Sequence, residues 1–232
     1  RKLFRAGADH IKICTTGGVL SPADDPRHSQ LSVPEIEAIV EEAAAQGTYV
    51  MAHAQGTEGI KNALRAGVKT IEHGIYLDDE AIDLFGEYDA WLVPTLIAPL
   101  MVIRKADAPG SALPPAVVAK ARAVVEIHRE SVQKAYEAGV RIALGTDTGV
   151  GPHGSNLEEL SLLCGIGMSL PEALRAATAD AGTFIGEGIG RLRPGSVGDA
   201  VLLDTRLDSP GDLSDLKTHI ARVYKDGVRV VG

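Results

Sequence analysis

Cysteine and aromatic residues are scarce in this chain of 232 residues, and acidic residues outnumber basic ones. The two cysteines cannot build a disulfide framework, so a reducing compartment, the cytoplasm, is the expected location. With 4% aromatic residues, the core must come from aliphatic side chains. The net charge of −8 argues against a nucleic acid or an anionic membrane as partner, since both bind basic surfaces.

Long apolar runs are also lacking. The longest, residues 90–103, contains Pro94 and Pro99 and is too short to cross a bilayer. We expect this run to form a buried strand and the loop that follows it. No membrane partner is therefore expected.

A recurring pattern does organise the chain. Each copy has a helix end, a glycine, a short apolar strand and a polar residue, and the copies span residues 5–13, 45–53, 65–73 and 137–147. Gly7, Gly47, Gly67 and Gly139 occupy the glycine position, where a left-handed helix cap favours glycine. Residues 86–95 form a weaker fifth copy. The repetition predicts successive strands, each preceded by a helix.

The stretches between the copies have helical periodicity. Ser32 is a candidate N-cap, with Pro34 in the first turn and Glu35 three residues on, and residues 115–138 predict a longer helix. Alternating strands and helices indicate an α/β fold with parallel strands. A doubly wound sheet is the rival architecture. We favour a (β/α)8 TIM-type barrel because polar residues end successive strands, where barrel active sites are built.

The C-terminal part has a different pattern. Residues 190–204 are a turn-rich entry into a strand, and residues 219–231 predict a hairpin that turns at Asp226 and Gly227. We therefore expect a barrel portion over residues 1–187 and a small β-sandwich appendage over residues 188–232.

Four polar residues end the predicted strands: Lys12, His53, His73 and Asp147. Period-two alternation places His53 on one face with Met51, and His73 on one face with Ile71. We expect that face to point into the barrel, so that the four side chains converge at its mouth.

Two imidazoles and a carboxylate suit Zn²⁺ or a similar divalent ion. The Lys12 ammonium would be repelled by such an ion, so it fits only as a neutral amine or as a carbamate formed with CO₂. The two carbamate oxygens could bridge metal ions about 3.5–4 Å apart. A lone strand-end histidine is more often a hydrogen-bonded core residue, but recurrence in successive units favours a metal site.

The residues around these positions resemble the amidohydrolase superfamily, and most closely its Xaa-Pro dipeptidase and aminoacyl-carboxypeptidase (prolidase-like) branch. The resemblance rests on Lys12 in Ile-Lys-Ile, His53 in Ala-His-Ala, His73 in Ile-Glu-His-Gly, Asp147 in Gly-Thr-Asp, residues 15–22, and residues 190–195 with Asp199. It extends over essentially the whole chain. It implies barrel strands four to eight, and two zinc ions bridged by carboxylated Lys12.

One departure from the family pattern concerns the His-x-His pair of its first barrel strand, which this sequence lacks. We expect the missing N-terminal barrel strands in the same or a companion chain. Residues 1–232 alone would leave two sheet edges open, and we expect them to aggregate. We also expect a homo-oligomer.

The resemblance implies a hydrolase that cleaves amide bonds of dipeptides or N-acyl amino acids such as Xaa-Pro. A metal-activated hydroxide would attack the carbonyl, and Asp147 would carry the proton to the leaving amine. The alternatives are a cyclic amidohydrolase of the imidazolonepropionase type, a mononuclear deaminase, and an inactive barrel scaffold. Metal content separates three of these readings: two ions for the dipeptidase, one for the deaminase and none for the scaffold.

Further residues carry weaker signals. Gln55 and Tyr76 follow the two histidines closely, and His153 and Asn156 follow Asp147, so all four could contact substrate. Solvated loop positions, or a helix start at 155–156, explain them equally well. His128, inside the predicted long helix, is expected on the surface.

Overall fold

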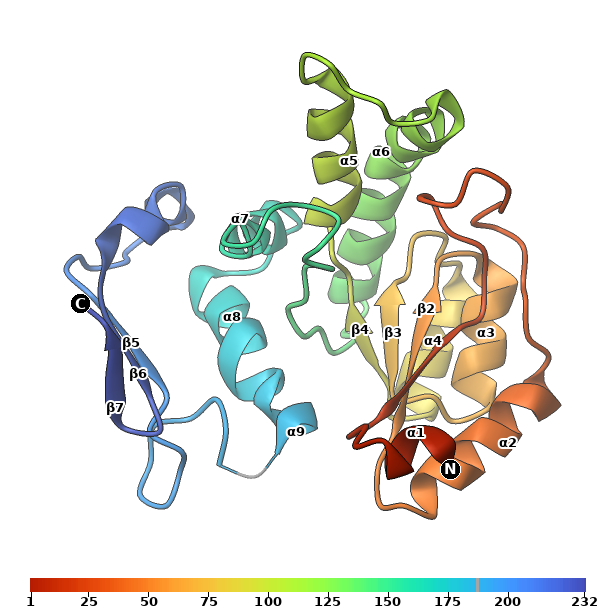
Figure 1. Cartoon of the computed structure of the whole chain (residues 1–232), viewed down its shortest axis with the longest axis horizontal. Helices are drawn as coiled ribbons and strands as arrows, with labels where there is room; N and C mark the ends of the chain where they lie inside the picture. Colours follow the sequence, from red (N-terminus) through yellow and green to blue (C-terminus); the bar gives the residue numbers. More distant parts are fainter. Residues whose placement is uncertain (187) are drawn as a thin grey trace. The chain divides into compact units, whose positions relative to one another are not determined.

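The computed structural model describes residues 1–186 and 188–232, in two compact units, Arg1–Ile142 and Ala143–Gly232 (Figure 1). The first unit contains α1 (Lys2–Arg5), β1 (Ile11–Cys14), α2 (Val33–Ala44), β2 (Val50–Ala54), α3 (Thr57–Arg65), β3 (Thr70–His73), α4 (Asp79–Glu87), β4 (Trp91–Val93), α5 (Ile97–Asp107) and α6 (Pro115–Glu137). In the described residues, no helix has the length and apolar character needed to span a bilayer.

Strands β1 to β4 form one parallel sheet in chain order (Figure 1). Helices α2, α3 and α4 each connect one strand to the next, and α3 packs against β2, β3 and α4. The predicted α/β architecture is confirmed, because neighbouring parallel strands joined through helices build this fold.

Small aliphatic residues fill the space between sheet and helices. Val50, Ala52, Ala54 and Ile71 are buried, and so is Ile60 of α3. Strands covered in this way read as nearly continuous apolar runs. Close packing of small side chains explains how the core forms with so few aromatic residues.

The expected helix ends are present. Gly7, Gly47, Gly67 and Gly139 have φ between 74° and 92°, the conformation that glycine adopts most readily. Helix α2 starts after Ser32 as predicted. The Glu35 carboxylate accepts hydrogen bonds from the Ser32 backbone N–H at 2.9 Å and from its hydroxyl at 2.7 Å, which completes a capping box.

Two sequence-based expectations were wrong in detail. The strand expected near residues 140–145 is reduced to a single parallel bridge between Ile142 and Leu92, and the Leu92 N–H donates to the Arg141 carbonyl at 2.9 Å. The apolar run 90–103 begins with the expected buried strand, β4, but its second half is a helix and not a loop, because α5 begins at Ile97. Pro99 lies in its first turn, where a backbone N–H has no partner within the helix.

The second unit contains α7 (Glu158–Gly165), α8 (Leu170–Arg175), a π-helix (Ala176–Asp180), α9 (Gly182–Ile185), β5 (Ala200–Leu203), 3₁₀ turns (Pro210–Leu213 and Leu216–His219), β6 (Ile220–Lys225) and β7 (Val228–Val231). Strands β5, β6 and β7 form an antiparallel sheet in that order. The predicted hairpin turns at Asp226 and Gly227, with φ of 50° and 74°. The predicted boundary at residue 187 lies outside the described residues, and it stays a prediction, as does the β-sandwich.

Gly59 in α3 is expected to tolerate no side chain. A Cβ there would lie 2.5 Å from the Thr15 carbonyl oxygen, whereas a Cβ on Gly86, exposed in α4, would meet nothing within 4 Å. Gly59→Ala should lower the free energy of unfolding by about 1–3 kcal/mol through overpacking. Gly86→Ala, the matched control, should raise it by about 0.5–1 kcal/mol. Denaturant unfolding measures both, and equal effects of the two substitutions would contradict this packing.

Candidate metal centre and active site

Lys12 and His53 lie on the same face of the sheet. The parallel register pairs Lys12 with Met51 and Cys14 with His53, and paired residues of parallel strands point the same way. None of these four side chains is buried, whereas the alternating positions of β2, which face the helices, are. The alternation expected for the second strand therefore holds.

His73 lies beside His53 as expected, but the prediction that Ile71 shares its face was wrong. The register pairs His53 with Glu72, and Ala54 with His73, so Glu72 rather than Ile71 shares the face of His53. His73 has a φ of 77° and leaves the extended conformation at the last residue of β3. The turn brings the two imidazoles together, with ring centroids 4.7 Å apart and planes at 70°.

Hydrogen bonds assign one proton on each imidazole. The His53 Nε2 lies 3.1 Å from the Gly17 carbonyl oxygen, which can only accept, so Nε2 carries the proton in the neutral ring. The His73 Nδ1 lies 2.7 Å from the Thr95 hydroxyl oxygen, and that hydroxyl donates to the Pro94 carbonyl at 2.6 Å. Because the hydroxyl has one proton, it accepts from His73. The lone pairs are therefore on His53 Nδ1 and His73 Nε2.

The electrostatic surroundings keep His73 neutral. Burial is the main cause that holds its pKa well below the usual histidine value, and Coulombic interactions with His53, His128 and Lys12 add to the effect. A neutral imidazole is the form that binds a metal ion. The influence of Lys12 also shows that its ammonium lies within electrostatic reach of the histidine.

Two buried groups near this pair escaped the sequence analysis. Glu72 is buried on the face of His53 and accepts a hydrogen bond from the Thr70 hydroxyl at 2.6 Å. His128 of α6, expected on the surface, is 1% exposed, and its Nε2 donates to the His73 carbonyl at 2.9 Å. Burial lowers the His128 pKa to about 4, against the opposing effect of the His73 and Pro94 carbonyls. Helical periodicity does not reveal a distant hydrogen-bond partner such as the His73 carbonyl. His128 was therefore assigned to the surface, where a single histidine in a helix is usually found.

The loop after β1 forms a wall beside His53. The Thr16 hydroxyl donates to the Gly17 carbonyl at 2.8 Å and accepts from the Gln55 N–H at 3.0 Å. A Cβ on Gly18 would lie 3.3 Å from Cε1 and Nε2 of His53. The glycine pair of the predicted family loop therefore allows the backbone to approach the imidazole closely.

Lys120 of α6 holds the same loop in place. Its ammonium donates to three backbone carbonyls, those of Gly18 at 3.1 Å, Asp24 at 2.7 Å and Ser21. A lysine ammonium has three donors, so this loop engages all of them. Helix α6 thus contacts the site at two places. Lys120 binds the loop beside His53, and His128 binds the His73 carbonyl.

Removing this lysine clamp should loosen the loop. Lys120→Met is expected to speed hydrogen exchange of the Gly17 amide, which donates to His28, by about tenfold or more. One hydrogen bond to a charged group contributes about 1.5–3 kcal/mol, and about 1.4 kcal/mol is a factor of ten. Lys105→Met, at an exposed position of α5, is the matched control and should leave the rate unchanged. An unaltered rate in Lys120→Met would contradict the clamp.

Gln55 and Tyr76, candidates for substrate contact, are joined through their backbones. Gln55 is buried, which excludes the solvated loop position, and its Oε1 has no hydrogen-bond partner among the described residues. The Tyr76 N–H donates to the Gln55 carbonyl at 2.9 Å, and the Tyr76 carbonyl accepts from the Thr57 hydroxyl at 2.7 Å. Burial is the main cause that raises the Tyr76 pKa.

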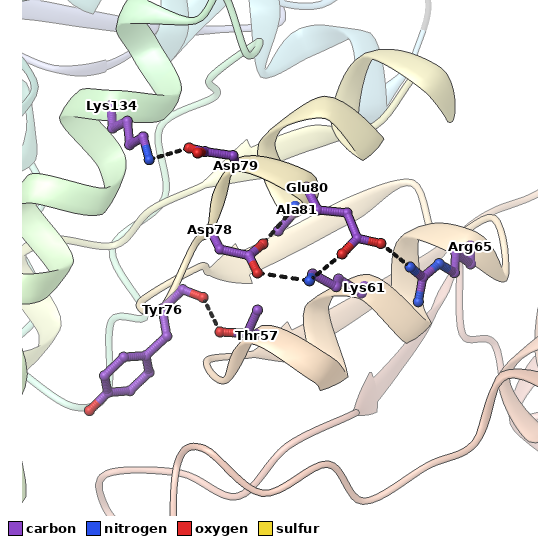
Figure 2. Close-up of polar contacts among 9 residues, drawn as sticks. All are labelled: Thr57, Lys61, Arg65, Tyr76, Asp78, Asp79, Glu80, Ala81 and Lys134. Atoms are coloured by element: carbon purple, nitrogen blue, oxygen red, sulfur yellow. Dashed lines mark hydrogen bonds and ion pairs between the residues drawn. The ribbon is translucent and has the colours of Figure 1, made fainter.

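An ion-pair network next to Tyr76 also supports the loop that contains this residue. The Lys61 ammonium of α3 contacts Asp78 at 2.7 Å and Glu80 at 2.6 Å, and Glu80 also pairs with Arg65. In Figure 2 the Tyr76 ring points away from these pairs. The network therefore holds the loop in place, while the Tyr76 phenol takes no part in the ion pairs.

The remaining candidates belong to the second unit. Asp147 is exposed in a turn, with φ of 51°, and its carbonyl accepts from the Val150 N–H at 3.1 Å. His153 and Asn156 are exposed in the loop that precedes α7. Convergence of Asp147 with the three residues of the first unit stays a prediction.

The histidine pair fits part of a divalent metal site. Over residues 1–186 and 188–232, no group of three or more His, Cys, Asp or Glu side chains could hold a metal ion. The predicted ligand set includes a lysine, and its aspartate belongs to the second unit. It therefore does not require three His, Cys, Asp or Glu side chains within one unit. What the first unit brings together is two imidazoles, each with one ring nitrogen held by an oxygen partner, as metal-ligating histidines are.

The sequence matches the amidohydrolase family over residues 1–230. It is 36% identical to an ochratoxinase of Aspergillus niger over 236 residues, which covers 98% of this chain and 47% of that protein. The fold is similar to that of a Xaa-Pro dipeptidase with methionine in its active site (TM-score 0.89, 36% identity, 99% of this chain and 56% of that one). A prolidase in complex with N-methylphosphonate-L-proline is similar as well (TM-score 0.91, 36% identity, 99% and 56%).

The chain belongs to the amidohydrolase family, and its fold is the parallel α/β barrel type of that family. This confirms the family and the fold class that the sequence predicts. The chain spans about half the length of the curated relatives it matches.

Proposed function

We propose that the protein is a metal-dependent hydrolase that cleaves amide bonds of dipeptides or N-acyl amino acids such as Xaa-Pro. One observation carries the proposal. His53 and His73, at the ends of adjacent parallel strands, lie with ring centroids 4.7 Å apart, and each keeps a lone pair on one nitrogen. Membership of the amidohydrolase family supports the reaction class.

The metal ligands in this proposal are His53, His73, Asp147 and Lys12, the last as a carbamate that bridges two zinc ions. When bound, the ions supply a nucleophilic water oxygen at neutral pH and polarise the scissile carbonyl. The neutral state of His73 and the lysine on the face of His53 support this ligand set.

Asp147 moves the proton in the proposed reaction. Its carboxylate takes a proton from the attacking water as the new C–O bond forms. It then gives that proton to the amine nitrogen as the C–N bond breaks, so that acid and amine products leave. An exposed carboxylate in a turn is free to serve in both roles. Gln55, Tyr76, His153 and Asn156 contact substrate in this proposal.

Two solved relatives with bound molecules support the proposed substrate class. One solved relative holds methionine in its active site, and another holds a phosphonate derivative of proline. Both molecules carry an amino-acid carboxylate. We therefore propose substrates that end in a free amino acid, with the cleaved amide on its nitrogen.

A substrate panel tests this function in the zinc-loaded full-length protein. We expect Xaa-Pro dipeptides and N-acyl amino acids to release the free C-terminal amino acid, and matched compounds with an amidated carboxyl group to react more slowly. Exclusive turnover of a cyclic imidazolone, or release of ammonia from an aminopurine, would contradict the proposed substrate class. A full-length protein that binds no zinc when zinc is supplied, and hydrolyses none of these compounds, would favour a scaffold.

Location and assembly are part of the same proposal. Cys14 and Cys164 are both free thiols, which supports a reducing compartment, the cytoplasm. The partners proposed are a small amide substrate, further copies of the protein in a homo-oligomer, and the remaining barrel strands in the same or a companion chain.

A further inference from the structure

His73 has an unusual backbone for the last residue of a strand. Its φ is 77°, and non-glycine residues adopt this region only where neighbouring contacts enforce it. The ladder between β3 and β4 ends at the pair Glu72 and Val93, so the His73 carbonyl lies beyond it. The register with β2 still pairs His73 with Ala54, and other groups hold the residue on the side where β4 has ended.

The His73 side chain is held by Thr95, which follows β4. The ring Nδ1 lies 2.7 Å from the Thr95 hydroxyl oxygen, and the hydroxyl lies 2.6 Å from the Pro94 carbonyl. The single hydroxyl proton goes to the carbonyl, which cannot donate, and this obliges Nδ1 of His73 to carry the ring proton. Thr95 is buried and has a φ of 54°, so it is itself fixed in a strained conformation.

The His73 backbone is held by His128 of α6. The His128 Nε2 donates to the His73 carbonyl at 2.9 Å, and the side chain is 1% exposed. The proposed reaction gives His128 no role that would account for a fully buried histidine in α6. Burying an imidazole is costly unless its polar atoms are bonded, and here Nε2 has the His73 carbonyl whereas Nδ1 has no partner among the described residues. The bond to the strand-end carbonyl is therefore the contact that calls for an explanation.

We propose that Thr95 and His128 are positioning residues for His73, Thr95 by placing the ring lone pair on Nε2 and His128 by fixing the bend that turns the ring toward His53. The inference rests on the proposed function only in taking His73 as a metal ligand. Outer partners of metal-ligating histidines act in this way, and their loss typically lowers metal affinity by about 10–100-fold.

The test compares matched substitutions in the full-length protein. Thr95→Val removes the hydroxyl and keeps the shape, whereas Thr95→Ser keeps the hydroxyl. His128→Met removes the donor, whereas His128→Gln places an amide N–H near the position of Nε2. Ser131→Ala removes another buried polar group of α6 and serves as the control.

Two measurements are made on each variant: zinc affinity by competition with a chromophoric chelator, and the imidazole ¹⁵N shifts of His73 in the metal-free protein. We expect Thr95→Val and His128→Met to bind zinc about 10–100-fold more weakly. Thr95→Val should also shift His73 toward a mixture of tautomers. Thr95→Ser, His128→Gln and Ser131→Ala should resemble the wild type.

The outcomes separate this inference from the proposed function. The positioning role would be overturned if Thr95→Val left both the His73 tautomer and the zinc affinity unchanged. It would also be overturned if Thr95→Ser bound zinc as weakly as Thr95→Val. If His128→Met does not fold, the His128→Gln variant and the Thr95 pair still decide. A wild-type protein that binds no zinc would refute the metal-dependent function, while the tautomer measurement would still test how Thr95 acts on His73.

Discussion

Lys12→Ala should remove bound metal from the protein and abolish hydrolysis. In the proposed site Lys12 contributes the bridging oxygens as a carbamate, and alanine has no group to replace them. Bound metal supplies several kcal/mol of transition-state stabilisation, and about 1.4 kcal/mol is a factor of ten in rate. We therefore expect kcat/KM to fall by about 10³-fold or more, with the metal content measured by mass spectrometry falling in parallel.

Short carboxylic acids provide a rescue experiment for Lys12→Ala. Acetate or propionate can occupy the space left by the carbamate and should restore part of the metal content and of the rate. Lys105→Ala, at an exposed position of α5, should retain both. A Lys12→Ala protein that keeps its full metal content and rate would refute the carbamate.

Asp147→Asn is expected to have the second largest effect. The amide keeps the size of the side chain but cannot accept and return a proton, so turnover should fall while substrate binding is largely kept. General acid–base groups contribute about 10²–10⁴-fold, and we expect kcat to fall within this range with KM nearly unchanged.

Asp83→Asn, at an exposed position of α4, is the matched control for Asp147→Asn and should leave kcat unchanged. Steady-state kinetics at saturating zinc measures both variants. A fall in kcat of less than about tenfold in Asp147→Asn, with metal retained, would show that another group moves the proton.

The repeated pattern of the sequence was sufficient to predict the parallel sheet. Its glycine caps recur at positive φ, and the capping box of Ser32 and Glu35 starts α2 where expected. These features are local, because a cap or a short apolar strand is determined by a few neighbouring residues. The fold class followed from them correctly, whereas the family was correctly predicted from the motifs around Lys12, His53, His73 and Asp147.

The geometry of His73 was beyond the reach of sequence patterns. Alternation assumes extended backbone, and it therefore placed Ile71 with His73 on the site face, whereas the structure places Glu72 there. A φ of 77° depends on tertiary contacts with Thr95 and His128. His128 was misassigned to the surface for the same reason, since its partner lies 55 residues away in the chain.

A crystal structure of the full-length protein grown with zinc, with anomalous difference density collected at the zinc edge, tests the central claim most directly. We expect a peak about 2.0–2.1 Å from both His73 Nε2 and His53 Nδ1, and a second peak on the other side of the Lys12 carbamate. Fully occupied zinc bound elsewhere, with no metal at His73 Nε2 or His53 Nδ1, would contradict it.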